Sequence, residues 1–248
     1  MDKVFVTTFN KRLYKEYAHR LIGTYSATDQ DTHMVVYVED DLKHYPKHTQ
    51  IEFRSLFDEE PELKNFIDRN HNRPVKDFYK DAVRFSYKVY GYCHAIKQYS
   101  DYDFIMGVDA DSVFYHPIPE KVVAEKLYKE DCMMTYLGRG GQYSECGFLG
   151  FNLKHPEIQN YADEMLRMYN SDDIYKLIEC HDSFVWDHVR VKFELEKGVK
   201  NNNIGDHKKA HVQARSILGM YYDHTKGPSR KSAGFSGENQ MVLREGRK

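Results

Sequence analysis

The sequence predicts an α/β fold with a mostly parallel central sheet and helices on both faces. Two observations lead to this class. Over about the first 110 residues, short apolar runs alternate with segments of helical periodicity, which is typical of the strand–helix repeats that build a parallel sheet. Polar residues follow these runs at once, as expected where strands end at a ligand-binding edge. The chain of 248 residues is long enough for one such domain with a sizeable core.

Apolar runs and helical spacing place the elements of the first half of the chain. The predicted buried strands are Lys3–Phe9, His33–Val38 and Phe104–Val108. The predicted helices cover 11–26, a short stretch around 58–69, and a long segment that Pro74 opens and that ends near Tyr99. Each helix is predicted from apolar residues that recur every three or four positions, as Leu13, Tyr17 and Leu21 do in the first.

The second half continues the same pattern and then loses it. Two further strands, Cys132–Leu137 and Gly147–Asn152, are predicted on either side of a loop at Gly138–Ser144. The predicted helices are 120–129, 156–170 and 182–192. Residues 228–248 are rich in Gly, Ser, Lys and Arg with little periodicity, so we expect a single domain over 1–227 followed by a flexible basic tail.

Composition and charge exclude several classes of protein. With 20 Tyr and 14 Phe but a mean hydropathy of −0.74, the chain fits a firm core under a very polar surface. A net charge of −2 argues against a purely electrostatic nucleic-acid binder. The four cysteines form no Cys-x-x-Cys pair, which favours reduced core thiols over a zinc site. Without a secretory leader or an apolar run of about 18 residues, we expect a cytoplasmic protein with no membrane span.

The pair Asp109 and Asp111 carries the strongest functional signal. It directly follows the predicted strand Phe104–Val108. Alternate residues of an extended chain point to one face, about 6–7 Å apart, so both carboxylates can approach one divalent cation or its bound water. Such a cation commonly completes its shell with the phosphates of a substrate. The pair therefore predicts an enzyme that handles a diphosphate.

A second motif near the C-terminus joins this pair in a family resemblance. The segment His224-Thr-Lys-Gly227 is followed by Lys231. Together with the strand–helix–strand first half and Asp109-Ala-Asp111, it resembles the GT-A class of nucleotide-sugar glycosyltransferases. Within this class it looks most like the retaining family of glycogenin and bacterial lipopolysaccharide galactosyltransferases. That family has the pattern His-x-x-Gly-x-x-Lys; here one more residue precedes Lys231 and the usual Pro-Trp is missing, so Lys226 and Arg230 are alternatives.

The resemblance implies a single GT-A-like, Rossmann-like domain, with a metal ion and a UDP- or GDP-sugar as cofactor and donor. The residues implied as ligands of Mn²⁺, or of Mg²⁺, are Asp109, Asp111 and His224. Imidazole among the ligands favours manganese. The residues implied around the nucleotide-sugar are Thr8, Asn10, Glu39 and Asp40 at the nucleoside, Gly227 and Lys231 at the diphosphate, and Arg84 and Lys88 at the sugar nucleotide.

The resemblance also implies two residues beside the reacting sugar, Glu145 and Asp182, and a transfer that retains anomeric configuration. Asp182 equally suits the N-terminus of the following helix as a cap, and in an inverting enzyme it would act as general base. The acceptor stays open among a surface glycan or lipopolysaccharide, a hydroxymethylated base of phage DNA, and a soluble small molecule. Six Lys or Arg against two Glu in residues 224–248 are the feature that favours DNA.

Two other function classes compete with this interpretation. Val108-Asp109-Ala-Asp111-Ser-Val113 also satisfies the haloacid-dehalogenase phosphatase signature, with Asp109 as nucleophile, Asp111 as acid/base and Gly205-Asp206 as a downstream acidic motif. That signature normally ends the first strand of its core, whereas here about 100 residues of α/β pattern precede it. The other class is a non-catalytic nucleotide-sugar binding module, which would keep Asp109 but lack a competent acceptor side.

Overall fold

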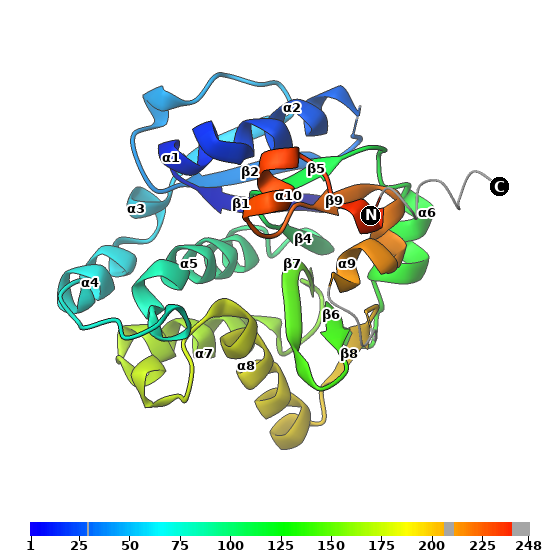
Figure 1. Ribbon diagram of the computed structural model, residues 1–248. Helices are drawn as coiled ribbons and strands as arrows, with labels where there is room; N and C mark the ends of the chain where they lie inside the picture. The colour runs from blue at the N-terminus through cyan, green and yellow to red at the C-terminus, as the bar shows by residue number, and fades with distance from the viewer. Residues whose placement is uncertain (29, 206–210, 240–248) are drawn as a thin grey trace.

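A seven-stranded sheet forms the centre of the molecule in the computed structural model, which describes residues 1–28, 30–205 and 211–239 (Figure 1). The strand order is β3-β2-β1-β4-β7-β6-β8. The strands are β1 (Lys3–Phe9), β2 (His33–Val38), β3 (Ile51–Ser55), β4 (Phe104–Val108), β6 (Cys132–Arg139), β7 (Gln142–Asn152) and β8 (Lys200–Asn203). The first four are parallel, β7 is antiparallel to both of its neighbours, and β8 is parallel to β6. The predicted class, α/β with a mostly parallel sheet, is confirmed.

Helices cover both faces of this sheet (Figure 1). One core joins the sheet to α3 (Leu56–Glu59), α4 (Pro61–Asn70), α5 (Ala82–Gln98), α7 (Ile158–Asn170) and α8 (Asp182–Lys197). The opposite core joins it to α2 (His19–Ala27), α9 (Val212–Arg215) and the segment 120–127, whose start is α6 (Glu120–Val122). Neighbours along β1 alternate between the two cores, with Val4 and Val6 in one and Phe5 in the other, as the strand period of two requires.

The remaining elements are short. Helix α1 (Lys11–Leu13) continues through a π-helical turn at Tyr14–Ala18 into α2, and α6 continues through another at Val123–Leu127. Turns of 3₁₀-helix lie at Leu42–His44, Phe78–Lys80, Asp173–Lys176 and Ile217–Met220. In the described part of the chain, no helix has the length and apolarity needed to cross a bilayer. All four cysteines are free thiols, and Cys93, Cys146 and Cys180 are buried, in agreement with the sequence prediction.

The strands β1, β2 and β4 have the predicted bounds, but the long helix does not begin at Pro74. Asp77 caps a 3₁₀ turn by accepting from the Tyr79 N–H at 2.7 Å, and Asp81 then caps α5 by accepting from the Arg84 N–H at 3.1 Å. Asp77 thus starts the 3₁₀ turn, and Asp81, which follows that turn, starts α5. The predicted loop at Gly138–Ser144 is also wrong, because β6 and β7 run into it and meet at a tight hairpin with Gly141 at φ +73°.

A two-stranded antiparallel sheet, which the sequence analysis did not predict, connects the middle of the chain to its C-terminal part. Strand β5 (Ser112–Phe114) pairs with β9 (Tyr222–His224), and Ser112 lies opposite His224. The Thr225 N–H and hydroxyl both bond to the Asp111 carbonyl, at 3.0 and 2.6 Å. This pairing brings the histidine of the C-terminal motif next to the acid pair.

Part of the segment expected to be a flexible tail is a folded element. Residues Pro228–Ala233 form α10, which lies near α1 and α2 in Figure 1. Farther on, Ser236 and Asn239 are fully buried, and the Asn239 amide donates to the Gly219 carbonyl at 3.0 Å. The domain therefore extends past Gly227 to at least residue 239. The rest of the expected tail, 240–248, lies outside the described residues.

Candidate active site

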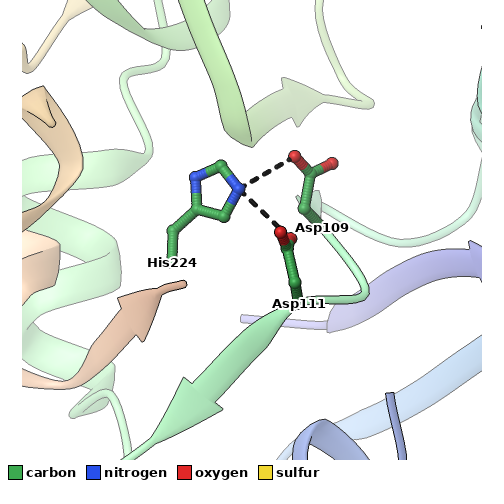
Figure 2. Close-up of side chains that lie close together, drawn as sticks. All are labelled: Asp109, Asp111 and His224. Carbon is green, nitrogen blue, oxygen red and sulfur yellow. Dashed lines mark ion pairs between the residues drawn. The ribbon is translucent and has the colours of Figure 1, made fainter. Parts of the chain in front are cut away.

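Asp109, Asp111 and His224 converge on one point at the end of β4. Figure 2 shows the imidazole beside both carboxylates, with its Nε2 3.3 Å from Asp109 Oδ2 and 3.2 Å from Asp111 Oδ1. One ligand atom from each of the three side chains lies within 4.8 Å of the others, a grouping that can hold a metal ion. The acid pair comes from the β4–β5 connection and the histidine from β9. The three residues predicted as metal ligands are thus brought together.

Two lysines contact the acid pair from opposite sides. Lys88 of α5 places its Nζ 2.5 Å from Asp109 Oδ1 and 3.0 Å from Asp182 Oδ2, and it also donates to the Cys146 carbonyl at 2.7 Å. Lys231 of α10 lies 3.1 Å from Asp111 Oδ2. Lys88 therefore ties Asp182 to the acid pair, while Lys231 joins α10 to it.

The cluster contains more negative than positive charge. Four carboxylates, Asp109, Asp111, Glu145 and Asp182, face two ammonium groups, Lys88 and Lys231, and the single imidazole of His224. Burial raises the pKa of Asp109, but the Lys88 ammonium and His224 together outweigh this and hold the pKa below its usual range. Burial lowers the pKa of His224, yet the charge of Asp111 and hydrogen bonds to the carboxylates raise it well above its usual value. The site as built attracts additional positive charge.

A large cavity of about 1770 Å³ opens on this cluster. It lies at the carboxyl ends of β1, β2 and β4, the edge of the sheet at which a ligand site was predicted. Ten of the predicted site residues line it, namely Thr8, Glu39, Arg84, Lys88, Asp109, Asp111, Asp182, His224, Gly227 and Lys231.

Asn10 and Asp40, predicted at the nucleoside, do not line the cavity and have structural partners instead. The Asn10 Oδ1 caps α1 by accepting from the Leu13 N–H at 3.0 Å, and its amide donates to Glu39 Oε2 at 2.8 Å. Asp40 accepts from the Lys11 N–H at 2.6 Å and from the Tyr45 hydroxyl at 2.5 Å. Both residues therefore fix the start of the first helix, and Asn10 orients Glu39.

Glu145, expected beside the reacting sugar, also lies outside the cavity lining. It is 1% exposed, and its Oε1 is 2.8 Å from Nδ1 of His224. The antiparallel pairing of β6 with β7 turns this side chain inward, where it contacts His224 on the nitrogen opposite the acid pair. In this structure Glu145 therefore contacts His224 and not the cavity, and its place beside the sugar stays a prediction.

Asp182 lies in the cluster, although it also begins α8. The cap of α8 is His181, whose Nδ1 accepts from the Phe184 N–H at 3.4 Å. The Oδ1 of Asp182 accepts from the Ser183 N–H at 2.9 Å, which leaves Oδ2 for Lys88. The place of Asp182 beside Lys88 in the cavity wall favours a role in the site over a role as a helix cap.

The C-terminal motif is held in shape by Gly227. Its φ of +88° lies in a region that side chains disfavour, and the carbonyl of Gly227 then accepts from the Lys231 N–H at 3.0 Å. Among the three basic candidates, Arg230 pairs with Glu238 at 2.6 Å and Lys226 lines the cavity, whereas Lys231 contacts Asp111. The extra residue before Lys231 is accommodated by the turn of α10.

The sequence analysis did not identify several residues that line the cavity. Tyr17 lies under Lys231, with the ammonium 4.2 Å from its ring centre, and on the opposite wall Phe78 and Tyr79 come from the 3₁₀ turn before α5. Tyr17 recurs at helical spacing, so the sequence assigned it to a core stripe. Only the packing of α10 against that helix shows that the ring faces the site.

Comparison with known proteins shows the fold. No family model matches the sequence, and no curated protein sequence does. A solved structure of the bifunctional glycosyltransferase WbbM, in its apo form, matches with a TM-score of 0.50 at 12% identity, over 76% of this chain and 37% of that one. The chain thus spans little more than a third of WbbM. The galactosyltransferase LgtC, solved with donor and acceptor sugar analogues, matches with a TM-score of 0.50 at 13% identity, over 98% of this chain and 95% of LgtC. The fold is a single GT-A-like domain, as predicted.

Glu39 provides a test of the nucleoside end of the cavity. Burial raises the pKa of its carboxyl to about 7, although the Asn10 amide opposes this. A raised folded-state pKa means that stability is lost as the pH rises from the unfolded value through about 7, because the fold must then carry the buried anion. Glu39→Gln should therefore be more stable than the wild type at pH 8, by about 2 kcal/mol, but not at pH 4.5. Urea unfolding at several pH values measures this.

The control for that measurement is Glu16→Gln, which changes an exposed carboxylate paired with Arg12 on the neighbouring helix. Its unfolding free energy should follow the wild-type pH dependence. Parallel curves for Glu39→Gln and the wild type would contradict the raised pKa.

Proposed function

We propose that this protein is a metal-dependent glycosyltransferase that moves a sugar from a nucleoside-diphosphate sugar to an acceptor hydroxyl. The observation that carries the proposal is the convergence of Asp109, Asp111 and His224 on one point in the wall of a cavity of about 1770 Å³. The GT-A-like fold supports it, since both structures described above are glycosyltransferases by name.

The donor set fits a divalent first-row cation. Two carboxylate oxygens and one imidazole nitrogen suit Mn²⁺ better than Mg²⁺, which prefers oxygen ligands alone. The excess of carboxylates over ammonium groups in the cluster would be neutralised by an ion of charge +2. When bound, the metal supplies Lewis-acid stabilisation of the departing diphosphate.

The chain's own residues would bind and orient the donor around that ion. Lys231 presents a point charge to a phosphate oxygen from the side of Asp111, held against the ring of Tyr17. Thr8 and Glu39 face the ribose end of the cavity, where a carboxylate suits hydroxyl groups. Lys88 keeps the Asp182 carboxylate next to Asp109, and we place Asp182 beside the anomeric carbon, where it stabilises developing positive charge during a retaining transfer.

For the acceptor we propose a glycan hydroxyl. Of the three described basic side chains in the segment that favoured DNA, two are paired within the domain and the third, Lys226, lines the cavity. Arg230 pairs with Glu238 and Lys231 pairs with Asp111, while Arg244, Arg247 and Lys248 lie outside the described residues. The modified-DNA acceptor is therefore not carried forward.

Donor hydrolysis tests the proposed function. The protein, incubated with UDP- and GDP-sugars and Mn²⁺, should slowly release UDP or GDP even without an acceptor, and chelation with EDTA should stop the release. Asp111→Asn removes one ligand charge and should lower the rate at least about a hundredfold, since the metal contributes several kcal/mol to leaving-group stabilisation. Chromatographic detection of the nucleotide measures both.

The matched control is Asp173→Asn, an acid paired with Arg167 and Lys176 at the surface, which should leave the rate unchanged. Three results would contradict the proposal. Undiminished release by Asp111→Asn would refute the metal assignment, and inorganic phosphate released from a phosphomonoester would favour the phosphatase. Nucleotide-sugar binding without turnover on any glycan acceptor would favour the binding module.

Gly147→Ala tests the placement of His224 without removing a ligand. A Cβ at this position would lie 2.3 Å from Nδ1 of His224, so the ring must shift from its present position. The stabilisation against heat that Mn²⁺ gives the wild type should be lost in this variant, while the apo protein should lose about 1–3 kcal/mol of stability through overpacking. Gly23→Ala, where an added Cβ meets nothing within 4 Å, is the control and should respond to Mn²⁺ like the wild type.

A further inference from the structure

A buried set of polar side chains lies behind His224, on the ring edge opposite the acid pair. Glu145 contacts Nδ1 of His224 at 2.8 Å, and Nδ1 of His211 lies 3.8 Å from the same Glu145 oxygen. His211 is held in turn by Asp223 at 3.2 Å and by the Ser236 hydroxyl at 3.0 Å. Glu145, His211, Asp223 and Ser236 are each at least nine-tenths buried, and none of them lines the cavity. The proposed transfer reaction gives none of these four side chains a role at the substrate.

The Glu145–His224 contact decides which nitrogen of His224 is left for a cation at the acid pair. A carboxylate oxygen can only accept, so Nδ1 of His224 must carry a hydrogen toward Glu145. Nε2, 3.2 Å from Asp111 and 3.3 Å from Asp109, likewise donates to carboxylates here, and a cation bound at the acid pair would take the place of that hydrogen while Glu145 keeps the one on Nδ1. A carboxylate behind a ligating histidine also fixes the ring orientation and increases its basicity.

The backbone of His211 supports a dedicated role for this arrangement. Its φ of +67° is in the left-handed region, and Asp172 is the other non-glycine residue with a positive φ in the described part of the chain. Such a conformation costs of order 1 kcal/mol and persists where the surrounding contacts enforce it. Here Asp223 and Ser236 enforce it, and the Ser236 hydroxyl and N–H both bond to the Asp223 carboxylate, at 2.7 and 2.5 Å.

We infer that Glu145 is a positioning residue for His224 as a ligand of a first-row divalent cation, and that His211 orients Glu145. The inference rests on the metal site of the proposed function. It adds that residues outside the cavity hold one ligand of that site in position. It assigns to Glu145 a contact with the metal ligand in place of the contact with the sugar expected from the resemblance. Gly147 completes the arrangement, since the absence of a Cβ there leaves room for the His224 ring.

The test measures Mn²⁺ binding directly, from the EPR signal of free Mn²⁺ during titration of the protein with the metal alone. Glu145→Gln keeps the size of the side chain but weakens the acceptor, and should raise the Mn²⁺ dissociation constant about 10–100-fold. Asp187→Asn is the matched control. Asp187 accepts from the N–H of Ser144, next to Glu145, at 2.7 Å and pairs with Arg190, yet it does not contact His224. This variant should lower thermal stability and leave Mn²⁺ affinity unchanged.

A spectroscopic signature separates positioning from a general loss of stability. Bound Mn²⁺ in the wild type should show ¹⁴N coupling from the His224 imidazole in pulsed EPR, and this coupling should weaken in Glu145→Gln at saturating metal. If Glu145→Gln fails to fold, His211→Asn tests the arrangement with the Glu145 side chain retained, and Asn tolerates the left-handed backbone. It should weaken Mn²⁺ binding by a smaller factor than the one expected for Glu145→Gln. Where both single variants fold, their effects should not add in the double variant.

The outcomes separate the two proposals. A wild type that binds no Mn²⁺ would refute the metal site of the proposed function, and this inference with it. A wild type that binds Mn²⁺ with ¹⁴N coupling, together with Glu145→Gln that binds equally tightly with the same coupling, would overturn only the role of Glu145. Equal losses in Glu145→Gln and Asp187→Asn would also overturn it, because they would mark a merely structural effect.

Discussion

The whole site depends on compensating two carboxylates that the fold places at the end of a buried strand. Asp109 and Asp111 follow β4 directly, and isolated charges at such a position are costly. Three elements near them each contribute a cationic or proton-bearing group: α5 gives Lys88, α10 gives Lys231 and β9 gives His224. Four carboxylates of the cluster still exceed its two ammonium groups and one imidazole, so the constraint that organises the site also leaves it with a surplus of negative charge.

The strands and the grouping of Asp109, Asp111 and His224 were the features that the sequence analysis predicted best. Apolar runs such as Phe104–Val108 are buried on both faces, so their bounds follow from hydrophobicity alone. The edge strand β3 was missed because it alternates with polar residues and is mostly half-buried, which leaves no continuous run. Helix α5 was started too early because Pro74 is a common helix opener, whereas the capping aspartate Asp81 decides the start.

Site residues could be predicted where the backbone pattern itself carries the information, and not where a contact joins distant segments. The spacing of the acid pair after an apolar run pointed to Asp109 and Asp111, and the family resemblance added His224. The role of Asn10 was within reach, since an Asn before the first helical residue is a common cap. The contact of Glu145 with His224 spans 79 residues and depends on the inward turn of β7, and the sequence holds no local signal for it.

The small sheet of β5 and β9 has a consequence for when the protein becomes competent. His224 reaches the acid pair only by pairing with a strand that was synthesised more than 100 residues earlier. The chain therefore carries both aspartates well before it has the histidine. The metal site that we propose is complete only after Tyr222–His224 have been synthesised, and a proteolytic product that ends before Tyr222 would lack the strand that brings the histidine to the acids.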